Sequence, residues 1–112
     1  MYAELHCLTH YSFLRGASAP EELVGRAANS GYHALAITDE CSLAGVVKAH
    51  VAAKERGLKL IVGSEFTLTE GIRLIALVPS REAYGELSGL ISRARRRSGK
   101  GEYRVHLRDV IF

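Results

Sequence analysis

The sequence contains few cysteines and no long apolar run. Cys7 and Cys41 are the only cysteines among 112 residues, and two are too few for a disulfide framework. The longest apolar stretches, LKLIVG and IRLIALV among them, are far too short to span a bilayer. The first residues also lack a basic segment followed by an apolar one, so we expect no secretory signal. These absences favour a cytoplasmic protein with reduced thiols and no membrane association.

The excess of basic over acidic residues is also small. The net charge of +3 permits contact with nucleic acid without demanding it, because the phosphate backbone rewards local clusters of Lys and Arg more than a small excess. The 112 residues, 47% of them hydrophobic, suffice for one small domain with a modest core. No internal repeat or low-complexity linker divides the chain.

Predicted helices and strands alternate along the sequence. In the first helix, Ser18 and Glu21 have the spacing of a capping box, Pro20 fits the first turn, and Gly31 ends the apolar stripe. The full set of expected elements is strands over 2–8, 33–38 and 58–63, a hairpin over 66–78 that turns near Glu70 and Gly71, and helices over 17–31, 42–57 and 80–97.

The resulting order is β-α-β-α-β-β-α with short connections. Such alternation indicates an α/β protein with a mainly parallel sheet. The last residues, HLRDVIF, enter a new element as the sequence ends, so we expect a piece of a longer protein.

Polar side chains fall at the ends of the three expected strands. Glu4 and His6 lie within or at the end of the first strand, Asp39 and Glu40 end the second, and Glu65 follows the third. Ligands of parallel α/β folds collect at the carboxyl ends of strands, and a His with several carboxylates would suit a divalent metal. The alternative for Asp39 is structural, because an Asp after a strand often caps the next helix or closes a turn.

Two long stretches of the sequence resemble one known family. LHCLTHYSFLRGAS and ALAITDECSLAGVVKAHVAAKERGLKLIVGSEF are similar to the start of the PHP (polymerase and histidinol phosphatase) domain of bacterial DNA polymerase III alpha-type chains. EAYGELSGLISRARRRSGKGEYRVHLRDV fits their error-prone, damage-tolerant branch, so the resemblance covers nearly the whole chain. It implies that residues 1–112 are the first half of a distorted (β/α)7 barrel with up to three metals at the strand ends.

The resemblance carries over unevenly to the metal ligands. Active members have His-x-His in the first motif, whereas this chain has His6-Cys7-Leu8, and a leucine cannot bind a metal. The second motif normally ends Thr-Asp-His, but here Glu40 follows Asp39; the glutamate of the third motif is present as Glu65. We therefore expect Zn or Mn to bind weakly or not at all.

Two further residues near the first motif are candidate ligands. His10 lies beyond the position of the missing histidine, where the chain should already be leaving the strand. Cys7 should point to the opposite face from His6 in a regular strand, so a small buried apolar role is expected for it.

The favoured hypothesis is a degenerate PHP-domain fragment with a structural or docking role. The parent chain would be a DNA polymerase (a nucleotidyltransferase) in DNA replication and repair. Its remainder would be this fragment's partner, and DNA would be bound through the full-length protein. The fragment alone is not expected to be catalytic. The alternative is a metal-dependent phosphoesterase or 3′-5′ exonuclease module, and a third hypothesis is a stand-alone α/β protein unrelated to replication.

Two surface features complete the predictions. A basic cluster lies at the end of the third helix and consists of Arg93, Arg95, Arg96, Arg97 and Lys100. The helix dipole favours cations at this end, so a solvated structural role is expected; contact with DNA or with the rest of the polymerase is the alternative. A half barrel would also leave an open sheet edge and apolar surface, so we expect the fragment to self-associate.

Overall fold

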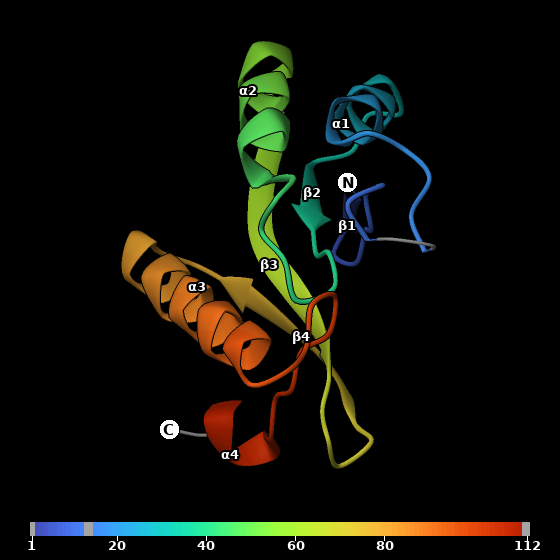
Figure 1. Ribbon diagram of the computed structural model, residues 1–112. Helices are drawn as coiled ribbons and strands as arrows, with labels where there is room; N and C mark the ends of the chain where they lie inside the picture. Colours follow the sequence, from blue (N-terminus) through green and yellow to red (C-terminus); the bar gives the residue numbers. More distant parts are fainter. Residues whose placement is uncertain (1, 13–14, 111–112) are drawn as a thin grey trace.

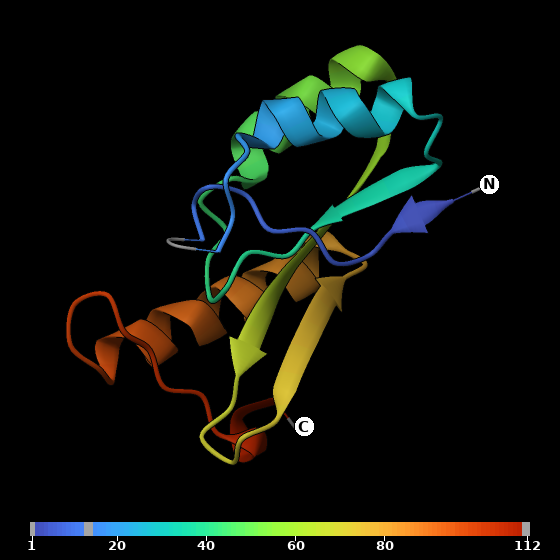
Figure 2. The ribbon, with the colours of Figure 1, turned by 90° about the vertical axis from the view of Figure 1, so that its right-hand side faces the viewer.

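A computed structural model describes residues 2–12 and 15–110 as a four-stranded sheet with helices (Figures 1 and 2). The elements in chain order are β1 (Ala3–Glu4), α1 (Pro20–Asn29), β2 (Ala34–Ile37), α2 (Val46–Arg56), β3 (Lys59–Thr67), β4 (Arg73–Val78), α3 (Arg81–Arg96) and the short α4 (Leu107–Val110).

The sheet has the strand order β1-β2-β3-β4, so neighbours in the chain are neighbours in space. β1 and β2 are parallel, as are β2 and β3, whereas β3 and β4 form an antiparallel hairpin. Gly71, with φ of 89°, lies in the hairpin turn, where a residue with a Cβ would be strained. The predicted mixed, mostly parallel half-barrel is therefore confirmed.

The strand lengths differ from the prediction at both ends of the sheet. β1 has two residues where a strand over 2–8 was expected, because the chain after Glu4 bonds to Thr38 and Asp39, just beyond β2, without continuing the ladder. β3 is longer than expected: the apolar run and the first arm of the hairpin form one strand of nine residues.

The start of α1 also corrects the prediction. The N-cap is Ala19 instead of Ser18, and the carboxylate of Glu22, not Glu21, accepts a hydrogen bond from the Ala19 amide at 3.2 Å. Pro20 occupies the first turn as expected, where its missing N–H costs nothing. Gly31, with φ of 77°, follows the C-terminus of the helix.

The start of α2 is later than expected. Ser42 does not cap it; instead its hydroxyl accepts a hydrogen bond from the Ala44 amide in a turn that precedes the helix, and Gly45 is the N-cap. The helix ends as predicted at Gly57, which has φ of 67°. In α3, Ser80 is a conventional N-cap whose side chain accepts from the Ala83 amide.

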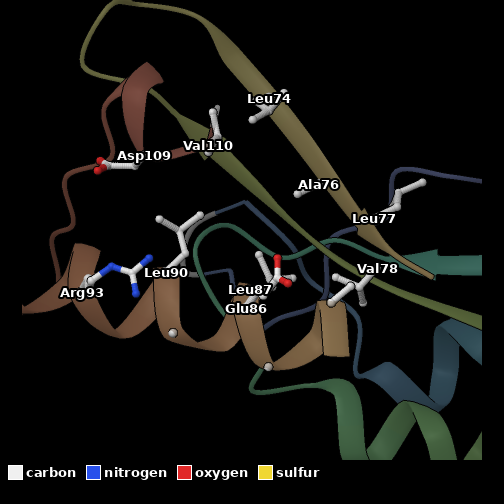
Figure 3. A pocket seen from close by; sticks show the side chains of 13 residues that line it. Leu74, Ala76, Leu77, Val78, Glu86, Leu87, Leu90, Arg93, Asp109 and Val110 are labelled. Carbon is white, nitrogen blue, oxygen red and sulfur yellow. The ribbon is translucent and has the colours of Figure 1, made fainter. Parts of the chain in front are cut away.

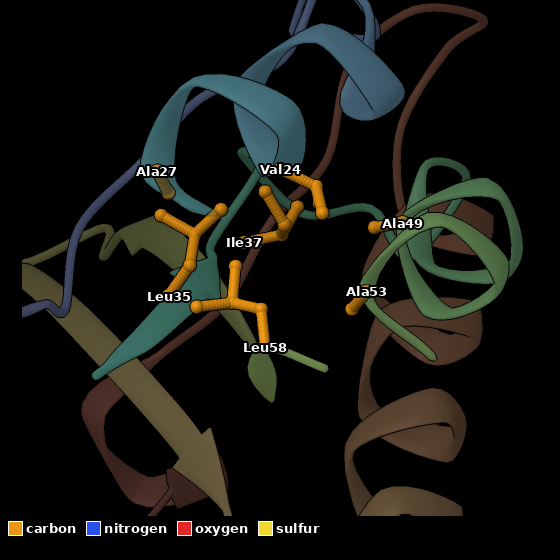
Figure 4. Close-up of a cluster of buried hydrophobic side chains, with 7 residues drawn as sticks. All are labelled: Val24, Ala27, Leu35, Ile37, Ala49, Ala53 and Leu58. Atoms are coloured by element: carbon orange, nitrogen blue, oxygen red, sulfur yellow. The ribbon is translucent and has the colours of Figure 1, made fainter. Parts of the chain in front are cut away.

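Two apolar clusters lie between the helices and the sheet. The first joins α1 and α2 to β2 (Figure 4); its members are Val24, Ala27, Leu35, Ile37, Ala49, Ala53 and Leu58. The second packs α3 against β3, through Cys41, Phe66, Leu68, Leu87, Leu90, Ala94 and Val105. Leu60 contacts the first cluster and Phe66 belongs to the second. Alternate residues of a strand share a face, so the two clusters cover the same face of β3.

The opposite face of the hairpin carries Gly63, Glu65, Ile75 and Leu77, since paired residues of antiparallel strands project to the same side. Ile75 and Leu77 are 36% and 40% exposed, whereas Glu65 is fully buried. The N-terminal loop contacts Glu65 from this side through His6 and Arg15. This face therefore holds the candidate site. No helix among residues 2–12 and 15–110 is long and apolar enough to cross a membrane.

Candidate functional site

Glu40 follows β2 and pairs with Glu65, which lies inside β3 and not after the third strand as expected. The two residues form a parallel β-bridge, held by hydrogen bonds from the Glu65 amide to the Asp39 carbonyl and from the Cys41 amide to the Glu65 carbonyl. Two of the carboxylates expected at the strand ends are thus neighbours in space.

His6 joins this pair through Glu65. Its Nε2 lies 2.9 Å from Glu65 Oε1, so imidazole and carboxylate bond to each other. His6 is partly exposed, whereas the Glu65 side chain is fully buried. A buried carboxylate needs partners for both oxygens, and His6 satisfies one of them.

Arg15 satisfies the other. Its Nη1 bonds to Glu65 Oε2 and lies 3.0 Å from Glu40 Oε1, so one cationic nitrogen bridges two carboxylates. Burial alone would raise the pKa of Glu65, but the hydrogen bond and charge of Arg15, helped by His6, hold that pKa below its usual range. Conversely, hydrogen bonds to Glu65 and Glu40 raise the pKa of Arg15.

Asp39 is buried but bonds elsewhere. Its Oδ1 accepts hydrogen bonds from the Thr9 amide at 2.6 Å and the Ser12 hydroxyl at 2.7 Å, and its Oδ2 accepts from the Thr9 hydroxyl at 2.7 Å. The Ser12 oxygen in turn accepts from the Glu40 amide. Asp39 therefore fastens the loop after His6 to the end of β2, and does not cap α2.

Glu4 has local partners as well. Its carboxylate accepts hydrogen bonds from the Tyr2 hydroxyl at 2.9 Å and from the His6 amide at 3.3 Å. Those bonds place it on the N-terminal strand, whereas His6, Glu40 and Glu65 gather around Arg15.

Glu40 is enclosed from the other side by the segment after α3. Tyr103 donates its hydroxyl to Glu40 Oε2 at 2.7 Å and accepts from the Thr67 amide. Burial and the hydrogen bond to Glu40 raise the pKa of Tyr103 to about 12. Arg95 lies over the Tyr103 ring and bonds to the Cys41 carbonyl at 2.9 Å. These residues border an open pocket of about 480 Å³ beside Glu40.

The two further candidate ligands have structural surroundings. The His10 ring stacks at a tilt on Tyr11, with 4.7 Å between ring centroids, and its amide bonds to the Ser18 carbonyl. Cys7 packs against the first apolar cluster, as expected for a small apolar residue, and burial raises the pKa of its thiol.

The described residues of the site do not offer a metal ion the set of ligands that it needs. Within residues 2–12 and 15–110, no group of three or more His, Cys, Asp or Glu side chains is arranged to hold one. The physical reason is visible in the contacts: His6 faces Glu65, Asp39 faces Thr9 and Ser12, and a guanidinium lies between the glutamates. The donors present do not fit a bound metal in this arrangement.

Four residues organise this site and were not predicted from the sequence: Thr9, Ser12, Arg15 and Tyr103. The first three lie within the stretch LHCLTHYSFLRGAS, which carries the family resemblance. A buried Glu expected at a strand end is a signal that a basic partner is needed. The sequence gives no indication of which arginine provides it.

Two members of the basic cluster at the end of α3 have structural partners. Arg95 bonds to the backbone at Cys41, and Arg97 forms a two-pronged ion pair with Asp109, at 2.6 and 3.1 Å. These contacts tie the C-terminal segment to α3 and to the site. The predicted role in DNA binding stays a prediction.

A family model described as the PHP domain matches residues 4–111. The chain belongs to the PHP domain family. Relatives of this PHP chain carry the name error-prone DNA polymerase: one from Saccharophagus degradans is 66% identical over 99% of the chain, and one from Dechloromonas aromatica is 62% identical over 97%. The chain spans 11% of the length of each of these relatives.

Solved structures support the same fold. A Bifidobacterium adolescentis protein assigned as a metal-dependent phosphoesterase matches 86% of the PHP chain with a TM-score of 0.66 and 32% identity. An amidohydrolase from Chromobacterium violaceum, with bound sulfate and no metal, matches 86% with a TM-score of 0.70 and 27% identity. The chain covers 34% of each of these structures.

Proposed function

We propose that this chain is the N-terminal part of the PHP domain of a longer error-prone DNA polymerase, in which it has a structural and docking role. The observation that carries the proposal is the site itself: Arg15 occupies the space between Glu40 and Glu65, and Asp39 is used to fasten a loop. A site closed by its own side chains supports a role in holding the chain together more than one in hydrolysis.

The metal chemistry of the family is weakened at the ligands as well. Leu8 stands where a ligand histidine belongs, so His6, Asp39, Glu65, Glu40 and Glu4 are proposed to retain at most weak affinity for Zn or Mn. Closely spaced cations repel one another unless enough anionic and imidazole groups surround them. The loss of one ligand should therefore abolish binding of several metals before it abolishes binding of a single weakly held metal.

The docking role is assigned to the open edge of the sheet. A groove of about 810 Å³ lies between β4 and α3, lined among others by Leu74, Val78, Leu87, Leu90 and Val110 (Figure 3). We assign this groove to the remainder of the polymerase chain, because the matched relatives and solved structures are much longer than this chain. DNA binding and the cytoplasmic location are assigned to that full-length protein.

Metal analysis and hydrolysis assays test the structural role. Purified wild-type chain should carry no stoichiometric metal, and added Zn²⁺ or Mn²⁺ should give little heat in calorimetric titration. It should also leave a single-stranded DNA 3′ end and bis-p-nitrophenyl phosphate intact. Tight binding that is lost in His6→Ala, together with phosphoester hydrolysis, would refute the proposal.

The second candidate function is a metal-dependent phosphoesterase or 3′-5′ exonuclease module. It is favoured by one observation, the 32% identity to the protein assigned as a metal-dependent phosphoesterase. Bound metal would supply a hydroxide near neutral pH and polarise a phosphoryl oxygen. Hydrolysis assays separate the two functions: metal-dependent cleavage by the wild type supports the enzyme, whereas no cleavage by either the wild type or Leu8→His supports a structural domain.

A further inference from the structure

The guanidinium of Arg15 lies between two carboxylates, although Arg15 itself comes from a loop. It bonds to Glu65, whose side chain is fully buried, and to Glu40, which is partly buried. Burying an ionised carboxylate without a partner is costly, and removing one member of a buried ion pair is strongly destabilising. The two glutamates therefore require a cation between them, and Arg15 provides it.

The contacts resemble those around an ion more than those of an ordinary surface pair. A single nitrogen, Nη1, contacts oxygens of both glutamates, while His6 binds the remaining oxygen of Glu65. A primary guanidinium nitrogen carries two N–H groups, so it can donate one to each carboxylate. One positive charge then lies between the two carboxylates without any external cation.

Hydrogen bonds and close packing hold the backbone around Arg15 near the end of β2. Asp39 binds both Thr9 and Ser12, and the Arg15 and Gly16 amides both donate to the Ser12 carbonyl at 3.0 Å. Gly16 packs so closely that an added Cβ would lie 2.0 Å from the Thr9 carbonyl oxygen. Asp39, an expected metal ligand, thus positions Arg15, whose guanidinium lies between two other expected ligands, Glu40 and Glu65.

We propose that Arg15 is a built-in cation that takes the place of a metal ion between Glu40 and Glu65 and fastens the N-terminal loop to the sheet without metal. This inference rests on the proposed structural function, since it concerns the same site. A missing ligand is then only one of two reasons why metal does not bind. In Leu8→His the guanidinium of Arg15 would still lie between Glu40 and Glu65. Leu8→His alone should gain little affinity, and full metal binding should require removal of Arg15 as well.

The experiment compares thermal unfolding of seven chains in buffer with EDTA, MnCl₂ or ZnCl₂. The chains are wild type, Leu8→His, Arg15→Gln, Arg15→Lys, Arg15→Gln/Leu8→His, Arg15→Gln/Glu65→Gln and the control Arg26→Gln, which changes an exposed arginine on α1. Metal analysis after gel filtration gives the stoichiometry for each. Wild type and control should unfold at the same midpoint in all three buffers.

Arg15→Gln should lower the midpoint by about 5–10 °C, because it leaves a buried carboxylate without its cation. Arg15→Lys keeps the charge and should lose less. Arg15→Gln/Leu8→His should bind Mn²⁺ or Zn²⁺ and regain much of the lost midpoint. Combining Arg15→Gln with Glu65→Gln should also recover part of the loss, since it removes the charge that Arg15 neutralises.

Three results would overturn the inference. They are stoichiometric metal in the wild type, an unchanged midpoint in Arg15→Gln, and a folded Arg15→Gln/Leu8→His that binds no metal. If Arg15→Gln does not fold, Arg15→Lys decides: a folded, metal-indifferent lysine chain supports the role of the charge, and an unfolded one contradicts it. Metal in the wild type without phosphoester hydrolysis refutes this inference alone, whereas hydrolysis refutes the proposed function.

Discussion

Gly16 is the residue at which the site depends most directly on the absence of a side chain. Its ideal Cβ would lie 2.0 Å from the Thr9 oxygen and 2.5 Å from the Thr9 carbonyl carbon, both backbone atoms that cannot rotate away. The constraint is one of space, and it keeps the loop close enough for Arg15 to reach Glu65.

Gly16→Ala should therefore lower the free energy of unfolding by about 1–3 kcal/mol, the usual cost of overpacking. Gly85 gives the matched control, because it lies exposed in α3 and nothing lies within 4 Å of its ideal Cβ. Gly85→Ala should raise stability by about 0.5–1 kcal/mol through helix propensity. Urea unfolding of both chains measures the difference; equal stabilities would contradict the role given to Gly16.

Asp109 is the residue with a clear pH signature. The two-pronged ion pair with Arg97 and the hydrogen bond from the His106 amide hold its pKa well below its usual range. A carboxyl whose pKa is lower in the folded chain stabilises that chain above the unfolded value of about 3.9, and the contribution is lost as pH falls through the folded value.

Arg97→Gln should return the pKa of Asp109 toward its ordinary range, so that the carboxyl protonates at a higher pH. A ¹³C NMR titration of the Asp109 carboxyl measures this shift directly. Arg96→Gln, at the exposed neighbouring position, is the control and should leave the titration where it is. An Asp109 pKa that stays low in Arg97→Gln would assign the effect to the backbone hydrogen bond instead.

At the scale of single elements, caps decide where helices begin. The Ser80 side chain accepts from the Ala83 amide at 3.2 Å, which satisfies one of the unpaired amides at the start of α3. Ser80→Ala should cost about 1 kcal/mol of stability, measured by chemical denaturation. Ser88→Ala, inside the same helix, should be neutral or slightly stabilising. A Ser80→Ala chain as stable as the wild type would show that solvent replaces the cap.

The sequence was informative where local chemistry determines an element. Gly31, Gly57 and the Glu70–Gly71 turn were predicted correctly, because a left-handed or turn conformation leaves a residue-type signature at that position. The starts of α1 and α2 were wrong, since a serine near a helix start can equally bond in a preceding turn, as Ser42 does.

The site could be predicted only in part, because some of its contacts join residues that are far apart in the sequence. Strand ends are readable from the pattern, and Glu40 and Glu65, both expected at strand ends, are paired in the structure although Glu65 lies inside β3. The partner of Glu65 is separated from it by 50 positions, and spacing alone does not identify such a contact. The carboxylate of Asp39 was recognised, but its binding to the loop followed from tertiary geometry that no local signal encodes.

At the scale of the whole molecule, the two edges of the sheet differ in what covers them. β1 is very short, which limits the backbone it offers for pairing. β4 has six residues, lies at the other end of the strand order, and is flanked by the groove on one face and by Ile75 and Leu77 on the other. In a longer chain this edge is where the next part of a half-barrel would add.

The isolated chain should therefore self-associate through β4, because edge backbone and apolar side chains gain from pairing with a second copy. Leu77→Glu should shift the mass measured by sedimentation or light scattering toward that of one chain, since a carboxylate at the edge would be desolvated on pairing. Val47→Glu is the control, because Val47 is 70% exposed on α2, away from this edge. A wild-type chain that is monomeric at high concentration would remove the association, whereas equal effects of both substitutions would move it to another surface. Association lost only in Leu77→Glu would place the contact between the two copies at the β4 edge.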